Sequence, residues 1–436
     1  MSHSELSLSR KDYPPLLFPD NPKPILIYIW AMRGKSAAVR FIFITILIDI
    51  IGIGIIIPIV PDLIQELTDF DNSTAAWYGG LLAATYATMQ FIFAPILGGL
   101  SDTYGRRTLL LISLFGLGLD YLVIVFAPSL AWLFIARIIS GICGSSMTVA
   151  NAYIADISGP EDRAKNFGMI GAAFGLGFIV GPTVGGLLGE YGTRVPFMAA
   201  AAMALLNWLY GYFVVPESLD AEHRRAFSWK RANPIGTLKS IFSNKIIVPL
   251  IISLFTIYVA AHATQSNWSF YTKEKFHWGA LEIGLSLGFV GVMVALIQGL
   301  VVGKVVKKLG EVKAVYLGFF FNALGLLLLG IITEPWMVYA VIVPYAFGGL
   351  AGPSLQSIMA GQTAKNAQGE LQGGITNIMM LTAIIGPPLM TGIFGYYTHP
   401  ETDYYYPGAP FILASFLAVL SILIASRTLQ KLRLNK

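Results

Sequence analysis

The stretch ITILIDIIGIGIIIPIVP, residues 44–61, places one carboxylate, Asp49, inside a run of isoleucine, leucine, valine and glycine. A helix needs about 20 apolar residues to cross a bilayer, and this run comes close to that length. A charge at mid-bilayer costs about 2.5–3.5 kcal/mol on insertion scales, and apolar side chains surround Asp49 on every helical face. The stretch therefore predicts a membrane-spanning helix whose single acid has a function.

Similar apolar blocks recur along all 436 residues. Charged residues make up 12% of the chain and apolar residues 55%, whereas about a quarter of an ordinary soluble protein is charged. This charge is too little to coat a water-exposed surface, so the composition predicts an all-α membrane protein. The single cysteine, Cys143, excludes a disulfide framework and a cysteine-based metal site, and we expect no cofactor and no metal.

Twelve transmembrane helices are predicted, over residues 41–61, 76–99, 108–127, 131–153, 165–189, 195–215, 246–270, 281–303, 313–332, 336–358, 371–396 and 409–428. The long hydrophilic stretch 216–245 is read as a linker between an N-terminal six-helix bundle over 41–215 and a C-terminal one over 246–430. Residues 1–40 form an N-terminal extension. Its apolar run 25–32 is too short to span, and we expect it to lie at the membrane interface.

The distribution of basic residues predicts the orientation in the membrane. With a cytoplasmic N-terminus, all but four of the 29 lysines and arginines fall in cytoplasmic segments, the exceptions being Arg137, Arg194, Lys273 and Lys275. This asymmetry follows the positive-inside rule. Both termini and the linker are therefore expected in the cytoplasm, and the net charge of +5 is assigned to orientation, with no nucleic-acid partner.

The two halves repeat each other. Five positions of the first half recur at one constant offset in the second: Gly98, Gly105, Gly168, Gly181 and Pro182 become Gly303, Gly310, Gly373, Gly386 and Pro387. Two parallel six-helix repeats around a central cavity are typical of transporters, and rocking of one repeat against the other gives alternating access.

The loop after the second span reads GGLSDTYGRR, residues 98–107, and resembles the signature of the major facilitator superfamily. Its glycines allow a tight turn, and Asp102 can pair with a basic residue or cap a helix N-terminus. The resemblance implies that Asp102, Gly105, Arg106 and Arg107 gate the cytoplasmic side. The alternative is a solvated basic turn.

Three further segments resemble this superfamily: RIISGICGSS at 137–146, GLGFIVGPTVGG at 175–186 and PESL at 216–219. The second is similar to a motif of drug/proton antiporters, and it adds Gly181 and Pro182 to the gating residues. Together with LIDIIGIGIIIPIVP, YATMQFIFAPILGGLSDTYGRR and GLDYLVIVFAP, these segments resemble the tetracycline/proton antiporter family. The resemblance implies a monomeric multi-pass protein of the bacterial inner membrane that exports a drug and confers antibiotic resistance.

Three intramembrane charges stand out as proton-coupling residues: Asp49, Asp120 and Arg137. Burial penalises the charged form of a carboxylate and a nearby arginine favours it, so a carboxylate under both effects can bind and release a proton near neutral pH. We expect Asp49 to titrate in this way, with Arg137 setting the balance. The resemblance places Asp120 in the same polar network. A static salt bridge that only fixes the helix register is the alternative.

The cavity is expected to be lined by polar residues of both halves: Gln90, Asn151, Asn207, His262, Gln265, Gln298, Asn322, Gln356 and Asn377. Any one of them can equally make a helix–helix hydrogen bond. Tetracycline exporters carry an acid in the ninth span and a histidine in the eighth, where this chain has Asn322 and Val294. Whether tetracycline itself is carried is therefore left open by the sequence.

The sequence as a whole favours a proton-coupled antiporter that exports a small amphipathic drug or metabolite. A facilitator or proton symporter for a sugar or another organic solute is the alternative on the same fold, and the glycine–proline pattern of 175–186 argues against it. A membrane-embedded enzyme or sensor without transport is a third interpretation. The sequence offers it no nucleophile–base pair, no HExxH zinc motif and no phosphate loop, and we predict no catalytic residues.

Overall fold

The computed structural model describes residues 23–434 except 145, 160, 230–245 and 365–366. Most of the expected linker and residues 1–22 of the expected extension therefore lie outside the described residues. Within the described part, twelve helical segments are long and apolar enough to cross a membrane, the number expected from the sequence, and no strand occurs there.

The first span consists of α1 (Lys23–Ile56), the 3₁₀ turn η1 (Ile57–Ile59) and α2 (Val60–Thr68). Pro58 and Pro61 explain the turn, because proline lacks the N–H that an α-helix needs and clashes with the preceding turn. The remaining spans of the first half are α3 (Asn72–Tyr104), α4 (Arg106–Val125), α5 (Leu130–Cys143) with α6 (Ser146–Ile157), α7 (Arg163–Gly189) and α8 (Val195–Val214).

α1 begins earlier than expected. It runs unbroken from Lys23, so the segment 25–32 is the first part of a long helix that continues into the first span. The reason lies in the sequence, since no proline falls between Pro24 and Pro58. The side chains of residues 23–38, Trp30 among them, lie outside the described set.

The second half contains two irregular turns that the sequence did not predict. Its spans are α10 (Ile247–Phe276), α11 (Ala280–Leu296) with the π-helical turn η3 (Ile297–Val301) and α12 (Val302–Leu309), α13 (Glu311–Ile331), α14 (Pro335–Ala346) with the 3₁₀ turn η4 (Phe347–Leu350) and α15 (Ala351–Gly361), α16 (Gln368–Thr398) and α17 (Ala409–Leu434). η4 lies near the middle of the span Pro335–Gly361, whereas η3 lies nearer the end than the start of the span Ala280–Leu309.

The internal repeat is visible in the backbone. Gly105 ends α3 and begins α4, and its counterpart Gly310 ends α12 and begins α13. Their φ angles are +96° and +81°, a region that glycine adopts readily and other residues rarely do. The two loops therefore share a conformation that explains why glycine stands at both positions.

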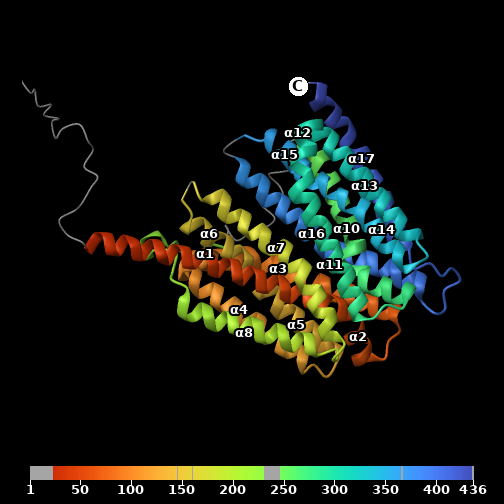
Figure 1. The fold of residues 1–436 in the computed structure, drawn as a ribbon, viewed down its shortest axis with the longest axis horizontal. Helices are drawn as coiled ribbons and strands as arrows, with labels where there is room; N and C mark the ends of the chain where they lie inside the picture. Colours follow the sequence, from red (N-terminus) through yellow and green to blue (C-terminus); the bar gives the residue numbers. More distant parts are fainter. Residues whose placement is uncertain (1–22, 145, 160, 230–245, 365–366, 435–436) are drawn as a thin grey trace, which may run out of the picture.

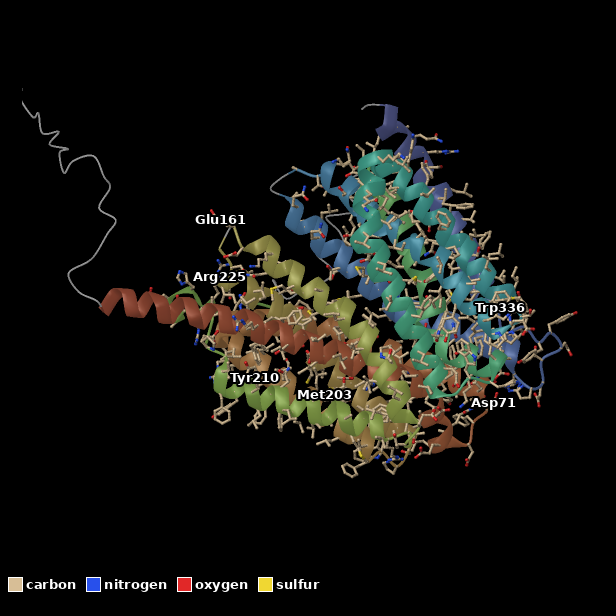
Figure 2. The ribbon with its side chains drawn as sticks, in the orientation of Figure 1. Asp71, Glu161, Met203, Tyr210, Arg225 and Trp336 are labelled. Carbon is tan, nitrogen blue, oxygen red and sulfur yellow. The ribbon has the colours of Figure 1, made fainter. Side chains whose placement is uncertain are left out.

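The two halves meet at one end of the molecule and diverge at the other (Figure 1). Figure 2 shows Glu161 and Arg225 where the halves diverge, which we call the open end, and Asp71 and Trp336 at the opposite, closed end. At the closed end α3 packs on α16 and α7 packs on α11, so closely that a Cβ on Gly80 would strike Thr391 and one on Gly284 would strike the Pro182 carbonyl.

Candidate functional site

α1 holds Asp49 against α6. The Ser146 hydroxyl donates to Asp49 Oδ2 over 3.4 Å, and the buried neighbours Ile46 and Ile50 fix the same stretch of helix. Asp49 is half-buried and faces another helix of the first half rather than lipid. Among the described residues, no lysine, arginine or histidine makes an ion pair with it.

The second acid is Asp120 on α4, which is 0% exposed. Arg137 of α5 donates from Nη2 to Asp120 Oδ2 over 3.3 Å. The other carboxylate oxygen, Oδ1, is buried without a hydrogen-bond partner among the described residues. Arg137 therefore makes its ion pair with Asp120. The sequence analysis expected this arginine to act on the protonation of Asp49 instead.

Two tyrosines connect the acids. Tyr86 of α3 and Tyr121 of α4 both lie within electrostatic reach of Asp49, Asp120 and Arg137. The Tyr121 hydroxyl also lies against Gly52, one turn of α1 beyond Asp49, where a Cβ would come within 2.6 Å of it. The three charges thus form one polar site built from helices of the first half, and sequence reasoning missed both phenols because isolated tyrosines carry no pattern.

Three of the expected cavity residues belong to the first half. Gln90 lies beside this site and donates to the Tyr86 hydroxyl and the Gly144 carbonyl over 3.4 and 3.3 Å. Asn207 is only 3% exposed and accepts a hydrogen bond from Thr45 of α1 over 3.4 Å. Of its two interpretations, the structure favours a helix–helix contact. Asn151 is half-buried on α6.

The expected residues of the second half are dispersed over five spans. His262 of α10 packs with its ring against Gly386 of α16, and Gln356 donates to the Tyr258 hydroxyl over 3.2 Å. Gln265 is exposed, and Asn377 is half-buried. Together they do not form one compact cluster.

Gln298 and Asn322 do come together around η4. Gln298 lies in the π turn η3 and approaches Gly349, while Asn322 of α13 packs against Gly348. The Asn322 Oδ1 atom is buried without a partner among the described residues. Because π turns inside α-helices occur frequently at functional sites, this corner is the part of the second half best suited to bind a polar group.

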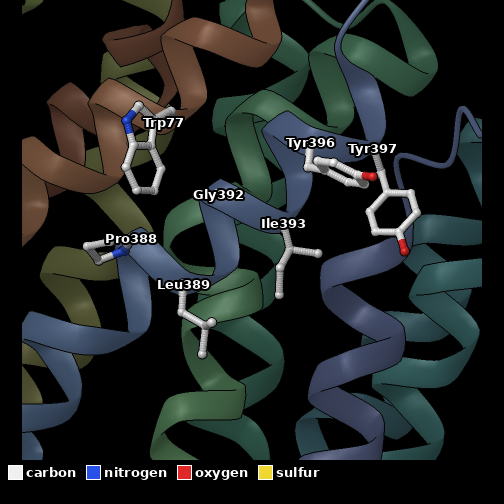
Figure 3. A pocket seen from close by; sticks show the side chains of 7 residues that line it. All are labelled: Trp77, Pro388, Leu389, Gly392, Ile393, Tyr396 and Tyr397. Atoms are coloured by element: carbon white, nitrogen blue, oxygen red, sulfur yellow. The ribbon is translucent and has the colours of Figure 1, made fainter. Parts of the chain in front are cut away.

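An open surface pocket of about 430 Å³ lies where α3 and α16 cross (Figure 3). It is lined by Trp77, Pro388, Leu389, Gly392, Ile393, Tyr396 and Tyr397, and none of the residues expected to bind substrate is among them. It is therefore distinct from the polar site around Asp49.

The signature loop forms a charge cluster. Arg106 Nη1 lies 2.6 Å from Asp102 Oδ1, and Arg106 Nε lies 3.1 Å from Asp156 Oδ2. Glu217 accepts from the backbone N–H of Arg106 over 2.8 Å and so caps α4, the role considered for Asp102. The PESL motif contains Glu217, so the sequence could have identified this residue. Asp156 lies in no motif, and the sequence offered no reason to select it.

All described contacts of this cluster stay within the first half and the start of the linker. Arg107 Nη2 donates to the Tyr212 carbonyl over 2.7 Å, and the Arg225 N–H donates to the Asp102 carbonyl over 3.0 Å. Gly181 and Pro182, by contrast, lie on α7 between the two halves. Gly181 packs on Gly54 of α1, and Pro182 turns its carbonyl toward α11.

Comparison with known proteins places these features in a family. The model of the Major Facilitator Superfamily matches residues 42–387. The class C tetracycline resistance protein of Escherichia coli is 39% identical over 363 residues, which cover 83% of this chain and 91% of that relative. The class H protein of Pasteurella multocida is 34% identical, over 90% of this chain and 96% of the relative.

Solved structures agree on the fold. A bacterial homologue of the human lysosomal transporter Spinster, in an inward-facing and unoccupied conformation, superposes with a TM-score of 0.73. The match covers 91% of this chain and 98% of the other, at 13% sequence identity. The likeness therefore concerns the architecture of twelve spans in two halves.

Proposed function

This chain belongs to the major facilitator superfamily, and on that premise we propose that it exports a small amphipathic drug or metabolite in exchange for protons. It is a multi-pass membrane transporter and not an enzyme, as its relatives are tetracycline resistance proteins over more than four-fifths of the chain. The drug-export interpretation is favoured over a sugar facilitator or symporter by the same relatives.

A tetracycline-like compound is the proposed cargo. The relatives named for tetracycline resistance support it, and the corner formed by Gln298 and Asn322 offers amide groups and one unpartnered oxygen for a polar substrate. This corner has no acid of its own, so recognition there would rest on neutral hydrogen bonds rather than on charge.

Asp49 is the proposed site of proton exchange, and a single observation carries this assignment. Of the two acids in the polar site, Asp120 has a countercharge in Arg137, whereas Asp49 has one long hydrogen bond from Ser146 and no ion pair among the described residues. An uncompensated carboxylate in a membrane interior gains most from binding a proton when its surroundings close. Its occupancy can therefore follow the alternation between the two states.

The open end is proposed to face the cytoplasm. The bias of lysine and arginine toward that end supports this orientation, with both termini inside and no cofactor other than the proton. The described conformation would then be inward-open and ready to load substrate. We propose that one chain suffices for the cycle, since each chain has both halves.

Transport by the protein reconstituted into liposomes tests the function. A pH gradient should drive wild-type protein to move a tetracycline probe in the direction opposite to the protons. Asp49→Asn should abolish this movement because the amide can no longer bind and release a proton. Probe binding and the amount of folded protein should stay close to wild type. Gradient-driven transport by Asp49→Asn at the wild-type rate would remove Asp49 from the mechanism.

Asp69→Asn is the matched control. Asp69 is an exposed acid in the loop between α2 and α3, so its substitution makes the same chemical change outside the polar site. It should leave gradient-driven transport unchanged. A wild-type protein that fails to transport any amphipathic probe in either direction would contradict export itself.

A further inference from the structure

The closed end contains polar contacts that join the two halves. Lys273, in the last turn of α10, binds the carboxylate of Asp62 on α2 and also donates to Gln65 Oε1 over 2.6 Å. Of the ion pairs between described residues, Lys273–Asp62 is the one that crosses from one half to the other. It adds a charged contact to an end where the helices also pack closely at glycines such as Gly80 and Gly284.

A second bridge lies beside the first. Asn72, at the start of α3, donates from Nδ2 to the Phe270 carbonyl over 3.0 Å and to Glu274 Oε2 over 2.9 Å. The other oxygen of Glu274 accepts from the Tyr405 hydroxyl over 2.9 Å. Burial and the neighbouring Glu274 carboxylate raise the pKa of Tyr405 to about 12, so its hydroxyl remains a donor that holds Glu274 in place.

From these contacts we infer that Lys273, Asp62, Asn72 and Glu274 form a lock that holds the closed end shut and must open in every transport cycle. The inference goes beyond the proposed function, because it needs alternation between two states but neither a particular substrate nor a particular proton site. Rocking of the halves pulls α10 away from α2 and α3, which breaks both bridges at once.

The lock has to be weak enough to open, and its exposure fits this requirement. The side chains of Lys273 and Asp62 are 27% and 31% exposed, so water competes for both charges. An ion pair of this kind contributes about 1 kcal/mol to the free-energy difference between the shut and the open form of this end, which is a five-fold change in their population ratio. That is enough to bias the resting conformation without trapping it.

The experiment measures the distance across the closed end in the absence of substrate. Cys143, the only cysteine, is replaced by serine, and spin labels are attached to cysteines introduced at Tyr191 and Trp336. These residues are 81% and 65% exposed and belong to different halves. Trp336 lies at the closed end in Figure 2, and Tyr191 follows the end of α7 at Gly189, where a Cβ would contact Ile59 and Ala280. Asp62→Asn and Lys273→Met should each increase the ratio of long to short distances about five-fold.

The control is an ion pair on the same helix that does not cross the halves. Glu66 of α2 pairs with Arg194 over 3.1 Å, and their side chains are 41% and 30% exposed. Glu66→Gln should leave the distance distribution unchanged. The exchanged pair Asp62→Lys with Lys273→Asp should return the distribution toward wild type.

The outcomes separate clearly. A distribution for Asp62→Asn that equals those of wild type and Glu66→Gln would overturn the lock. So would an exchanged pair that folds yet stays as open as the single variants. Because no substrate or gradient is present, these results stand whether or not tetracycline-like export is observed.

Discussion

Asp49 and Asp120 are acids of the same half that differ in what surrounds their charge. Asp49 was found from the sequence because a lone acid in an isoleucine-rich run conflicts with its surroundings. Its partner Ser146 and the Arg137–Asp120 pair could not be found that way, since the contacts depend on how α1, α4, α5 and α6 rotate against each other. Sequence reasoning thus identifies the charged residues but not their pairing.

The Arg137–Asp120 pair should be a structural requirement of the first half. Arg137→Ala would leave Asp120, 0% exposed, as a buried charge without its partner, and should lower the free energy of unfolding by about 3–5 kcal/mol. The double variant Asp120→Asn with Arg137→Gln removes both charges and should recover most of this loss. Unfolding in detergent micelles measures both.

Two outcomes would contradict this role. If Arg137→Ala unfolds at the wild-type midpoint, the pair contributes nothing to stability. If the double variant is less stable than Arg137→Ala, the charges are not acting on each other. Arg225→Ala, which removes an arginine with an exposed side chain from the linker, is the control for loss of an arginine as such.

At the scale of secondary-structure elements, the loops at Gly105 and Gly310 follow from the sequence and the irregular turns do not. Their shared backbone conformation agrees with the internal repeat that predicted them. The π turn η3 reads IQGLV, with one glycine and no proline, and a single glycine inside a helical pattern is too weak a signal to predict a break. It becomes apparent only where Gln298 meets Gly349 across two spans.

The two loop glycines should differ in how costly they are to replace. Alanine at either position meets backbone strain of about 1–3 kcal/mol, because both φ angles are strongly positive. At Gly310 the new Cβ would have no atom within 4 Å among the residues that the structure describes, whereas at Gly105 it would strike the Glu217 carboxylate that caps α4. Gly105→Ala should therefore destabilise the protein more than Gly310→Ala, by about 1 kcal/mol for the lost cap.

Thermal unfolding of the two alanine variants in the same detergent checks this difference. Glu217→Gln serves as a reference, since it weakens the cap without touching the glycine. If the two alanine variants unfold at the same temperature, the contact of Glu217 with the α4 N-terminus does not matter for stability.

At the scale of the whole molecule, the twelve spans were predictable and the conformation was not. Each span is a local apolar run, and its length follows from the thickness of the bilayer. Which ends of the halves meet depends on surfaces far apart in the sequence, such as Gly80 against Thr391 and Gly284 against Pro182. A transporter that alternates between two conformations needs other surfaces to meet in the second one, and no local sequence pattern selects between the two sets.

One face of α7 continues from the closed end into the open end. Toward the closed end, Gly186, Pro182 and Ile179 lie against α11. Continuing in steps of three or four residues along the same face leads to Gly175 and Gly171, and no atom of the described residues lies within 4 Å of a Cβ placed on either. If the halves rock, this free part of the face must come into contact when the open end closes.

Gly171→Leu should therefore spare the described conformation and block the other one. The leucine has free space now, so the thermal midpoint should stay within a few degrees of wild type, but it would hold α7 and the second half apart when the open end closes. Substrate should still bind from the open end, while transport in liposomes should fall at least ten-fold. Gly159→Leu adds the same bulk at the open end in the loop before α7, also with no atom of the described part of the chain within 4 Å, and should transport normally. Wild-type transport by Gly171→Leu would mean that this face of α7 never closes, and the two halves would then have to move in some other way.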